Sequence, residues 1–151
     1  MKEVCRMEKY KHVGVYGVLE EDNKVLLIKK SRGPHKGKWD LPGGTIEFGE
    51  EPYEALKREF LEETGISEIE ATIRSAKSYT IIYFFKENEL EEMHHIGIIY
   101  TVKVINHQYD LKIHGDYEDS LGAEWISIND LANIETTPFV KEIYLRVKES
   151  P

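Results

Sequence analysis

Hydrophobic and polar positions along the chain follow two periods, one typical of a helix and one typical of strands. The helical period is clearest from Pro52 to Thr64, where at about 100° per residue one face carries Tyr53, Leu56, Phe60 and Thr64. Proline suits the first helical position, and Gly65 follows as a C-terminal stop. The pattern therefore predicts a helix whose apolar face packs on a sheet.

The N-terminal half before this helix reads as a β-hairpin followed by a loop. His12–Leu19 is rich in β-branched and aromatic residues, and residues 21–23 supply a turn before the apolar run within Lys24–Lys30. Residues 1–11 are polar and are expected to form a loose arm or an edge strand. Ser31–Lys38 is a loop by its glycine and proline content.

The half after the helix predicts further strands. Ala71–Phe85 reads as one long strand or two, and its Thr80–Phe85 part is apolar on both faces, which predicts a central position in the sheet. Lys86–Glu92 reads as an acidic loop. Residues from Ile96 to Val104 alternate as a strand does, and Ala123–Ile128 is a short strand.

A last helix is expected to begin at Thr137 and Pro138, with an apolar stripe through Val140, Ile143, Tyr144 and Val147. Strands mixed with helices, and no repeat or linker, predict a single α/β domain over residues 1–151 with a mixed sheet.

Composition narrows the class of protein. The chain of 151 residues has a formal charge of −8, which argues against a nucleic-acid binder with a basic face. No apolar run approaches the roughly 18 residues that span a membrane, and the N-terminus lacks an apolar signal core. Cys5 is the single cysteine, so no internal disulfide forms. These features predict a cytoplasmic protein without a membrane partner; a homodimer and a monomer both stay open.

Three carboxylates stand together on the predicted helix. Glu59 faces both Glu62 and Glu63, since residues three and four apart are neighbours on a helix surface. Like charges at the edge of a buried face must either protonate or bind cations, and oxygen ligands favour Mg²⁺ or Mn²⁺. Taken alone, the three glutamates are better explained as a solvated acidic face, which is what most glutamate-rich helices carry.

The spacing around the glutamates carries a resemblance. From Gly44 the chain reads G-x5-E-x7-R-E-F-x-E-E-x-G-I, ending at Ile66, with fixed positions Gly44, Glu50, Arg58, Glu59, Glu62, Glu63 and Gly65. This stretch resembles the Nudix box, the signature of the Nudix hydrolase family. Phe60 stands where a branched aliphatic residue is more usual, and the flanking KGKWDLPGG and EWISI are also similar to the family.

The resemblance implies an α/β/α sandwich in which a loop–helix–loop holds Mg²⁺ or Mn²⁺ against a diphosphate. It implies that Glu59, Glu62 and Glu63 are catalytic metal ligands and that the carbonyl of Gly43 joins them. Gly43 and Gly44 let the backbone approach a metal–phosphate group. Arg58 has carboxylate partners in Glu50 and its helix neighbours, so its expected role is to orient glutamates; an ordinary surface ion pair predicts the same geometry.

The reaction that follows is hydrolysis of a phosphoanhydride, with a carboxylate as general base. The base stays open between a box glutamate, the pair Glu118 and Asp119, and the acidic segment Glu87–Glu92, and each loop acid also reads as plain solvated charge. Lys30 and Arg32 are candidates for phosphate contact or for surface charge, because relatives often carry a basic residue after the second strand.

Aromatic and histidine residues are harder to assign. Trp39, Tyr79, Tyr83 and Phe84 either stack on a base or belong to the core, and Trp125 is expected in the core. His94 and His95 point to opposite sides of a strand and do not share a metal.

The substrate is expected to be a nucleoside triphosphate or another nucleoside diphosphate derivative. The proline that ADP-ribose hydrolases carry about fifteen residues after the box is replaced here by Thr80 and Ile81. Tyr83 only weakly resembles the tyrosine of dinucleoside polyphosphate hydrolases. The alternative function is a non-catalytic nucleotide-binding sensor domain of Nudix fold.

Overall fold

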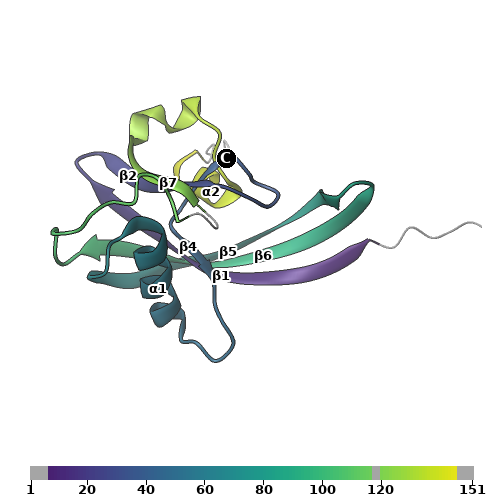
Figure 1. Ribbon diagram of the computed structural model, residues 1–151, viewed down its shortest axis with the longest axis horizontal. Helices are drawn as coiled ribbons and strands as arrows, with labels where there is room; N and C mark the ends of the chain where they lie inside the picture. Colours follow the sequence, from purple (N-terminus) through teal and green to yellow (C-terminus); the bar gives the residue numbers. More distant parts are fainter. Residues whose placement is uncertain (1–6, 117–119, 146–151) are drawn as a thin grey trace, which may run out of the picture.

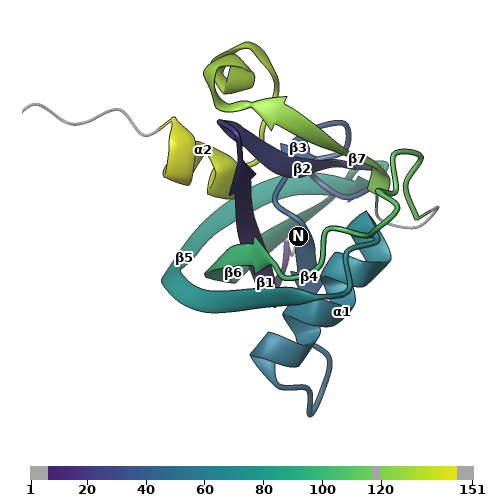
Figure 2. The same ribbon diagram turned by 90° about the vertical axis from the view of Figure 1, so that its left-hand side faces the viewer.

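The computed structural model describes residues 7–116 and 120–145. In this part of the chain a curled, mixed β-sheet lies between two α-helices (Figures 1 and 2). The elements in chain order are β1 (Glu8–Glu21), β2 (Lys24–Lys30), β3 (Trp39–Asp40), β4 (Gly43–Thr45), α1 (Pro52–Thr64), β5 (Ile69–Lys86), β6 (Glu89–Val104), β7 (Ser120–Ser127), the 3₁₀ helix η1 (Ile128–Asn133) and α2 (Pro138–Tyr144).

The sheet is organised around β1. Its strands run in the order β3-β2-β1-β6-β5, with β4 paired to β1 and β7 paired to β2. β1 and β6 are parallel from the pair Glu8–Glu91 to the pair Leu19–Val102, whereas the other pairings are antiparallel. β1, β5 and β6 extend together as a long arm beyond the helices (Figure 1).

Side chains of β1 and β2 alternate between two cores, as the period of two in a strand requires. Val15 and Leu19 belong to the core under α1, while Tyr16 and Val18 belong to the core under α2. The predicted α/β sandwich with a mixed sheet is confirmed, because each face of these strands carries its own helix.

Two glycines let an aromatic ring pack closely against each face of the sheet. A Cβ atom at Gly17 would lie 2.4 Å from Phe60 of α1, and one at Gly97 would lie 2.7 Å from Phe139 of α2. Both helices can therefore approach the sheet closely.

The predicted helix from Pro52 to Thr64 is confirmed with both of its ends. Pro52 occupies the first turn, and Gly65 ends the helix with φ 85° and donates its N–H to the carbonyl of Leu61 over 3.0 Å. A Cβ atom at Gly65 would lie 2.3 Å from the carbonyl oxygen of Asp110, so the segment after β6 also requires glycine there. Leu56 and Phe60 are fully buried.

Two predictions about the β5–β6 region are wrong. Thr80–Phe85 was expected at the centre of the sheet, but β5 is an edge strand in which Ile82 and Phe84 are 53% and 70% exposed. The expected acidic loop is a tight turn at Glu87 and Asn88, where Asn88 has φ 65° and β6 begins at the next residue. Apolar residues on both faces of a strand thus did not mean that helices cover both faces.

The β1–β2 hairpin and the start of α2 follow the sequence, whereas β6 begins at Glu89 and β7 at Ser120, earlier than the expected Ile96 and Ala123. The β1–β2 hairpin turns at Asp22 and Asn23, both with positive φ, and β1 begins earlier than expected, so residues 8–11 belong to a strand. α2 begins at Pro138 as predicted, and Val147 of its expected stripe lies outside the described residues. No helix in the described residues is long and apolar enough to cross a membrane.

Candidate functional site

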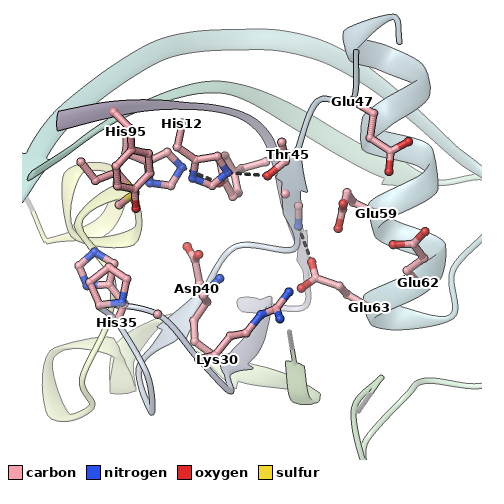
Figure 3. A pocket seen from close by; sticks show the side chains of 18 of the residues that line it. His12, Lys30, His35, Asp40, Thr45, Glu47, Glu59, Glu62, Glu63 and His95 are labelled. Atoms are coloured by element: carbon pink, nitrogen blue, oxygen red, sulfur yellow. Dashed lines mark hydrogen bonds between the residues drawn. The ribbon is translucent and has the colours of Figure 1, made fainter. Parts of the chain in front are cut away.

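A cavity of about 520 Å³ lies between α1, the β4 turn and the arm of β1, β5 and β6 (Figure 3). Its acidic wall comes from α1 and the loop before it, and the facing wall is built from aromatic rings and histidines of the arm. The side chains with ionisable or aromatic groups that line it are Tyr10, His12, Tyr16, Lys30, Arg32, His35, Asp40, Glu47, Arg58, Glu59, Glu62, Glu63, Tyr83 and His95.

The cavity brings together most of the residues singled out from the sequence. The three glutamates share its lining with two glycines and three basic residues: Glu59, Glu62, Glu63, Gly43, Gly44, Arg58, Lys30 and Arg32. Two other predicted residues do not line the cavity themselves. Glu50 binds Arg58, and Gly65 ends the helix. Residues chosen from their spacing in the sequence therefore line one cavity.

Glu63 is the most deeply placed of the three glutamates. Its side chain lies at the end of α1, and its Oε1 accepts the backbone N–H of Gly43 over 2.8 Å. Burial raises the pKa of this carboxyl well above its usual value, although the hydrogen bond from Gly43 opposes the shift. Gly43 therefore contacts the acidic set through its amide.

The two glycines of the turn make room for protein atoms. A Cβ atom at Gly44 would lie 2.6 Å from Cδ of Glu59, and one at Gly43 would lie 2.0 Å from the carbonyl oxygen of Val15. Gly43 also has φ 152°. The absence of side chains here lets β4 pair with β1 while the Glu59 carboxylate lies against the turn.

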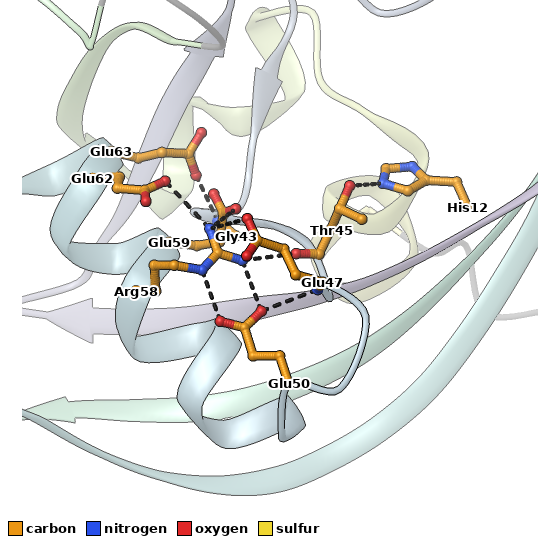
Figure 4. A network of polar contacts seen from close by, with 9 residues as sticks. All are labelled: His12, Gly43, Thr45, Glu47, Glu50, Arg58, Glu59, Glu62 and Glu63. Carbon is orange, nitrogen blue, oxygen red and sulfur yellow. Dashed lines mark hydrogen bonds and ion pairs between the residues drawn. The ribbon is translucent and has the colours of Figure 1, made fainter.

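Arg58 connects the carboxylates of the acidic wall (Figure 4). Its guanidinium donates two hydrogen bonds to Glu50, at 2.8 and 2.9 Å, and one to Glu59 at 2.8 Å. It also donates to the carbonyl of Thr45 at 3.0 Å and lies 3.4 Å from Glu62. The hydrogen bonds from Arg58 lower the pKa of Glu50 to about 2, and those carboxylates raise the pKa of Arg58. An orienting role and an ordinary ion pair both predict this geometry, so the orienting role stays a prediction.

The chemistry of this wall fits a hard divalent cation. Its donors are carboxylate and backbone oxygens, and Glu63 is buried beside Glu59 with no ion pair to any residue that the structure describes. Within residues 7–116 and 120–145, no three acidic, histidine or cysteine side chains already surround one point at metal-binding distance. The three glutamates therefore share one wall of the cavity without surrounding a single point.

The candidates for the general base fall into different places. Glu118 and Asp119 lie outside the described residues. None of the acids in Glu87–Glu92 lines the cavity: Glu91 accepts a hydrogen bond from Tyr83 over 2.7 Å, and Glu92 pairs with Lys9 at 3.5 Å.

Asp40 is an acid of the cavity that sequence reasoning missed. It is buried, and its Oδ1 accepts the backbone N–H of Leu41 over 2.8 Å and the hydroxyl of Thr137 over 2.7 Å. Burial raises its pKa, which nearby Lys30 opposes. The position of this acid between Trp39 and Leu41, just before the glycine turn, was the available signal.

The histidines of the cavity were also missed, and the aromatic residues divide between site and core. His94 and His95 lie on opposite faces as expected, and only His95 lines the cavity, stacked on His12 with ring centroids 4.4 Å apart. Tyr83 lines the cavity, Trp39 and Trp125 pack against the two cores, and Phe84 is exposed. Parallel pairing of β1 with β6 brings His12 beside His95, which no local pattern predicts.

Comparison with known proteins decides the family. The model of the NUDIX domain matches residues 9–147. The chain belongs to the Nudix family. An ADP-ribose pyrophosphatase of Methanocaldococcus jannaschii is 38% identical over 122 residues, which are 81% of this chain and 65% of that protein. The human nucleoside diphosphate-linked moiety X motif 6 is 32% identical over 87% of this chain and 39% of its own length. This Nudix chain thus spans less than two thirds of either relative.

Further Nudix relatives agree in sequence and fold. The nucleoside triphosphatase NudI of Escherichia coli O6:K15:H31 is 32% identical over 78% of this chain and 83% of its own. The crystal structure of the MutT protein from Methanosarcina mazei matches with a TM-score of 0.63 and 25% identity, over 93% of this chain and 95% of that one. A MutT Nudix hydrolase from Burkholderia pseudomallei matches with a TM-score of 0.62 and 23% identity, over 92% and 99% of the two chains.

Proposed function

We propose that this chain hydrolyses a phosphoanhydride bond in a nucleoside triphosphate or a nucleoside diphosphate-linked compound, with Mg²⁺ or Mn²⁺ as cofactor. The observation that carries the proposal is the position of Glu59, Glu62 and Glu63 on one wall of a cavity that also contains Lys30 and Arg32. The names of the relatives, which include an ADP-ribose pyrophosphatase and a nucleoside triphosphatase, support the same reaction class.

The three glutamates and the Gly43 carbonyl would hold the cation. A bound cation would supply positive charge for the diphosphate oxygens and Lewis acidity to activate the attacking water. Arg58 keeps Glu59 in place through its 2.8 Å hydrogen bond, so that this carboxylate does not turn into solvent. Lys30 and Arg32 add positive charge to a cavity that otherwise repels phosphates, and they are assigned to the oxygens of the substrate.

The general base is an acid that can hold a proton during attack by water. A box glutamate is the candidate among the described residues, and a glutamate that acts as base is one whose carboxylate does not hold the cation. Glu118 and Asp119 remain candidates from the sequence. Measuring kcat against pH and against Mg²⁺ concentration for Glu63→Gln, Glu118→Gln and Asp119→Asn separates them. Loss of the base removes the acidic limb at every Mg²⁺ concentration, whereas loss of a cation ligand raises the Mg²⁺ concentration that activity requires.

The test of the function is a substrate panel. The purified protein is incubated with Mg²⁺ and nucleoside triphosphates, ADP-ribose, dinucleoside polyphosphates and nucleotide sugars, and released phosphate, pyrophosphate and monophosphate are measured. ADP-ribose belongs in the panel because a 38% identical relative is named for it, although Thr80 and Ile81 stand where such enzymes carry proline.

Two glutamate variants on the same helix make the panel specific. Glu63→Gln is expected to lose at least a hundredfold in kcat, whereas Glu54→Gln, at an exposed position paired only with Lys57 at 3.3 Å, is expected to match wild type. Tight binding without turnover of any compound would favour a nucleotide sensor. Equal activity of the two variants would refute the assignment of the helix.

A further inference from the structure

Four side chains, Tyr16, His95, Tyr79 and His35, form a hydrogen-bonded relay. Its two histidines lie on the side of the cavity that faces the glutamates (Figure 3). The Tyr16 hydroxyl lies 2.6 Å from Nε2 of His95, and Nδ1 of the same ring lies 2.7 Å from the Tyr79 hydroxyl. Tyr79 in turn lies 3.1 Å from Nε2 of His35. Nδ1 of His35 is buried and has no partner among the described residues.

The ring of His95 is held from its other side as well. His12 stacks on it, with ring planes 18° apart, and Nε2 of His12 lies 2.7 Å from Oγ1 of Thr45 on β4. Space for the Tyr16 hydroxyl comes from Gly14, where a Cβ atom would lie 2.6 Å from it. The relay is therefore a packed unit and not a set of surface contacts.

Both histidines of the relay are neutral. Burial, assisted by neighbouring positive groups, lowers the pKa of His95 to about 3 and that of His35 to about 4. Each ring then carries one N–H, and each tyrosine carries one O–H, because burial raises the pKa of both phenols.

A count of protons shows that the relay has one to spare. The four groups bring four protons, and the three hydrogen bonds between them use three. If every bond runs toward His35, the spare proton lies on Nδ1 of His35; if every bond runs toward Tyr16, it lies on the Tyr16 hydroxyl. The direction of the relay decides which group presents a donor.

The surroundings of His35 favour the second direction. Nδ1 of His35 is buried and has no partner among the described residues, so an N–H at this atom would lack an acceptor. Lys38, Lys30 and Lys141 also repel a proton from His35, whereas the buried carboxyl of Asp40 acts on Tyr16. The spare proton therefore lies at the Tyr16 end of the relay.

We propose that this relay makes the Tyr16 hydroxyl a permanent hydrogen-bond donor into the cavity and that it binds an acceptor oxygen of the substrate. The identity of the ligand as a phosphate compound rests on the proposed function; the direction of the relay does not. Tyr16 touches substrate, while His95, Tyr79 and His35 position its proton. A neutral donor suits this position beside carboxylates, because a cationic side chain would form an ion pair with them and would not be available to the substrate.

Tautomers of the two histidines test the direction without any substrate. In a long-range ¹H–¹⁵N spectrum of the uniformly labelled protein, His95 and His35 are both expected as Nε2–H tautomers. The opposite direction makes both of them Nδ1–H tautomers. An Nδ1–H signal from His95, or a charged imidazolium at pH 7, would overturn the proposal.

The substrate contact is tested by calorimetry with two probes in Mg²⁺ buffer, α,β-methylene-ADP and inorganic pyrophosphate. Tyr16→Phe is expected to bind α,β-methylene-ADP about five- to tenfold more weakly than wild type. The matched control is Tyr53→Phe, whose hydroxyl bonds the carbonyl of Ile69 at 3.3 Å away from the cavity, and its affinity is expected to be unchanged.

Each pattern of losses has a meaning. An equal loss for both probes places the acceptor on the diphosphate, and a loss for the nucleotide alone places it on the ribose or base. Unchanged affinity for both probes, or no binding of either by wild type, overturns the contact. If wild type binds the probes and hydrolyses nothing in the panel, the proposed function fails and the relay stands.

The positioning role of Tyr79 has its own readout. Tyr79→Phe breaks the relay, which frees His95 to accept the Tyr16 proton, so its affinity for α,β-methylene-ADP is expected to fall about twofold to fivefold. In a Tyr16→Phe background the same change is expected to have no effect. Additive losses in the double variant would refute the coupling.

Discussion

The backbone amide of Gly43 donates a hydrogen bond to the carboxylate of Glu63 over 2.8 Å, although twenty positions separate the two residues. This bond joins the glycine turn at β4 to the last turn of α1. It fixes the direction of a carboxylate that burial would otherwise leave without a partner, and it makes the turn and the helix one wall of the cavity.

The first prediction is that Glu63→Gln stabilises the chain while it removes activity. The folded pKa of Glu63 lies above its ordinary value of 4.5, so ionisation weakens the fold as pH rises beyond that value. An amide still accepts the Gly43 proton and carries no charge. We expect the free energy of unfolding at pH 8 in EDTA to rise by about 1–2 kcal/mol.

Chemical denaturation at two pH values checks this sign. At pH 4, where the carboxyl is protonated in both states, wild type and Glu63→Gln are expected to differ little. A variant less stable than wild type at pH 8 would show that the Glu63 charge is already compensated in the folded protein.

A second prediction separates site geometry from stability at Gly44. A Cβ atom there meets Cδ of Glu59 at 2.6 Å, and Glu59 can turn away because it is the end of a flexible side chain. Gly44→Ala is therefore expected to change the free energy of unfolding by less than about 1 kcal/mol while kcat falls at least tenfold. Wild-type kcat in a folded Gly44→Ala protein would contradict the importance of this contact.

The third prediction concerns the shape of Arg58. Its planar guanidinium reaches Glu50, Glu59 and the carbonyl of Thr45 together, which a single ammonium group does not do. Arg58→Lys is expected to lower kcat about 10- to 100-fold with KM changed less than threefold. Lys57→Arg, the neighbouring exchange on α1, serves as the control with kinetics like wild type.

Acid stability should depend on the Glu50–Arg58 contact. The folded pKa of Glu50 is about 2 and its ordinary value is 4.5, so the contact contributes stability above pH 4.5 and loses it as pH falls toward 2. Denaturation curves of wild type and Glu50→Gln are therefore expected to differ at pH 6 and to converge by pH 2. If the free energies of unfolding of the two proteins differ by the same amount from pH 6 to pH 2, the effect of Glu50→Gln comes from packing and not from the ion pair.

A fifth prediction contrasts two phenylalanines. Phe60 is fully buried between α1 and the sheet, whereas Phe84 on the edge strand is 70% exposed. Phe60→Ala is expected to cost about 3–5 kcal/mol and Phe84→Ala less than about 0.5 kcal/mol in unfolding free energy. A large loss at Phe84 would mean that another surface, such as a second copy of the chain, covers it.

The sequence by itself determined the elements whose signals are local. Helix α1 could be read from its proline start, its glycine end and its apolar stripe, because each depends on residues within a few positions. The spacing of Gly44, Arg58 and the three glutamates is also a local signal, because these residues all lie in the short stretch from β4 to the end of α1. That is why the family and the acidic wall of the cavity followed from the order of residues.

Only the tertiary structure decided what stands opposite that wall. His12, Tyr16, Tyr79 and His95 come from three strands, and they meet because β1 pairs in parallel with β6 while β5 pairs with β6 from the other side. The edge position of β5 was hidden for the same reason, since an apolar strand reads alike at the centre and at the edge of a sheet. Strand order and register arise from contacts distant along the chain, and no local period encodes them.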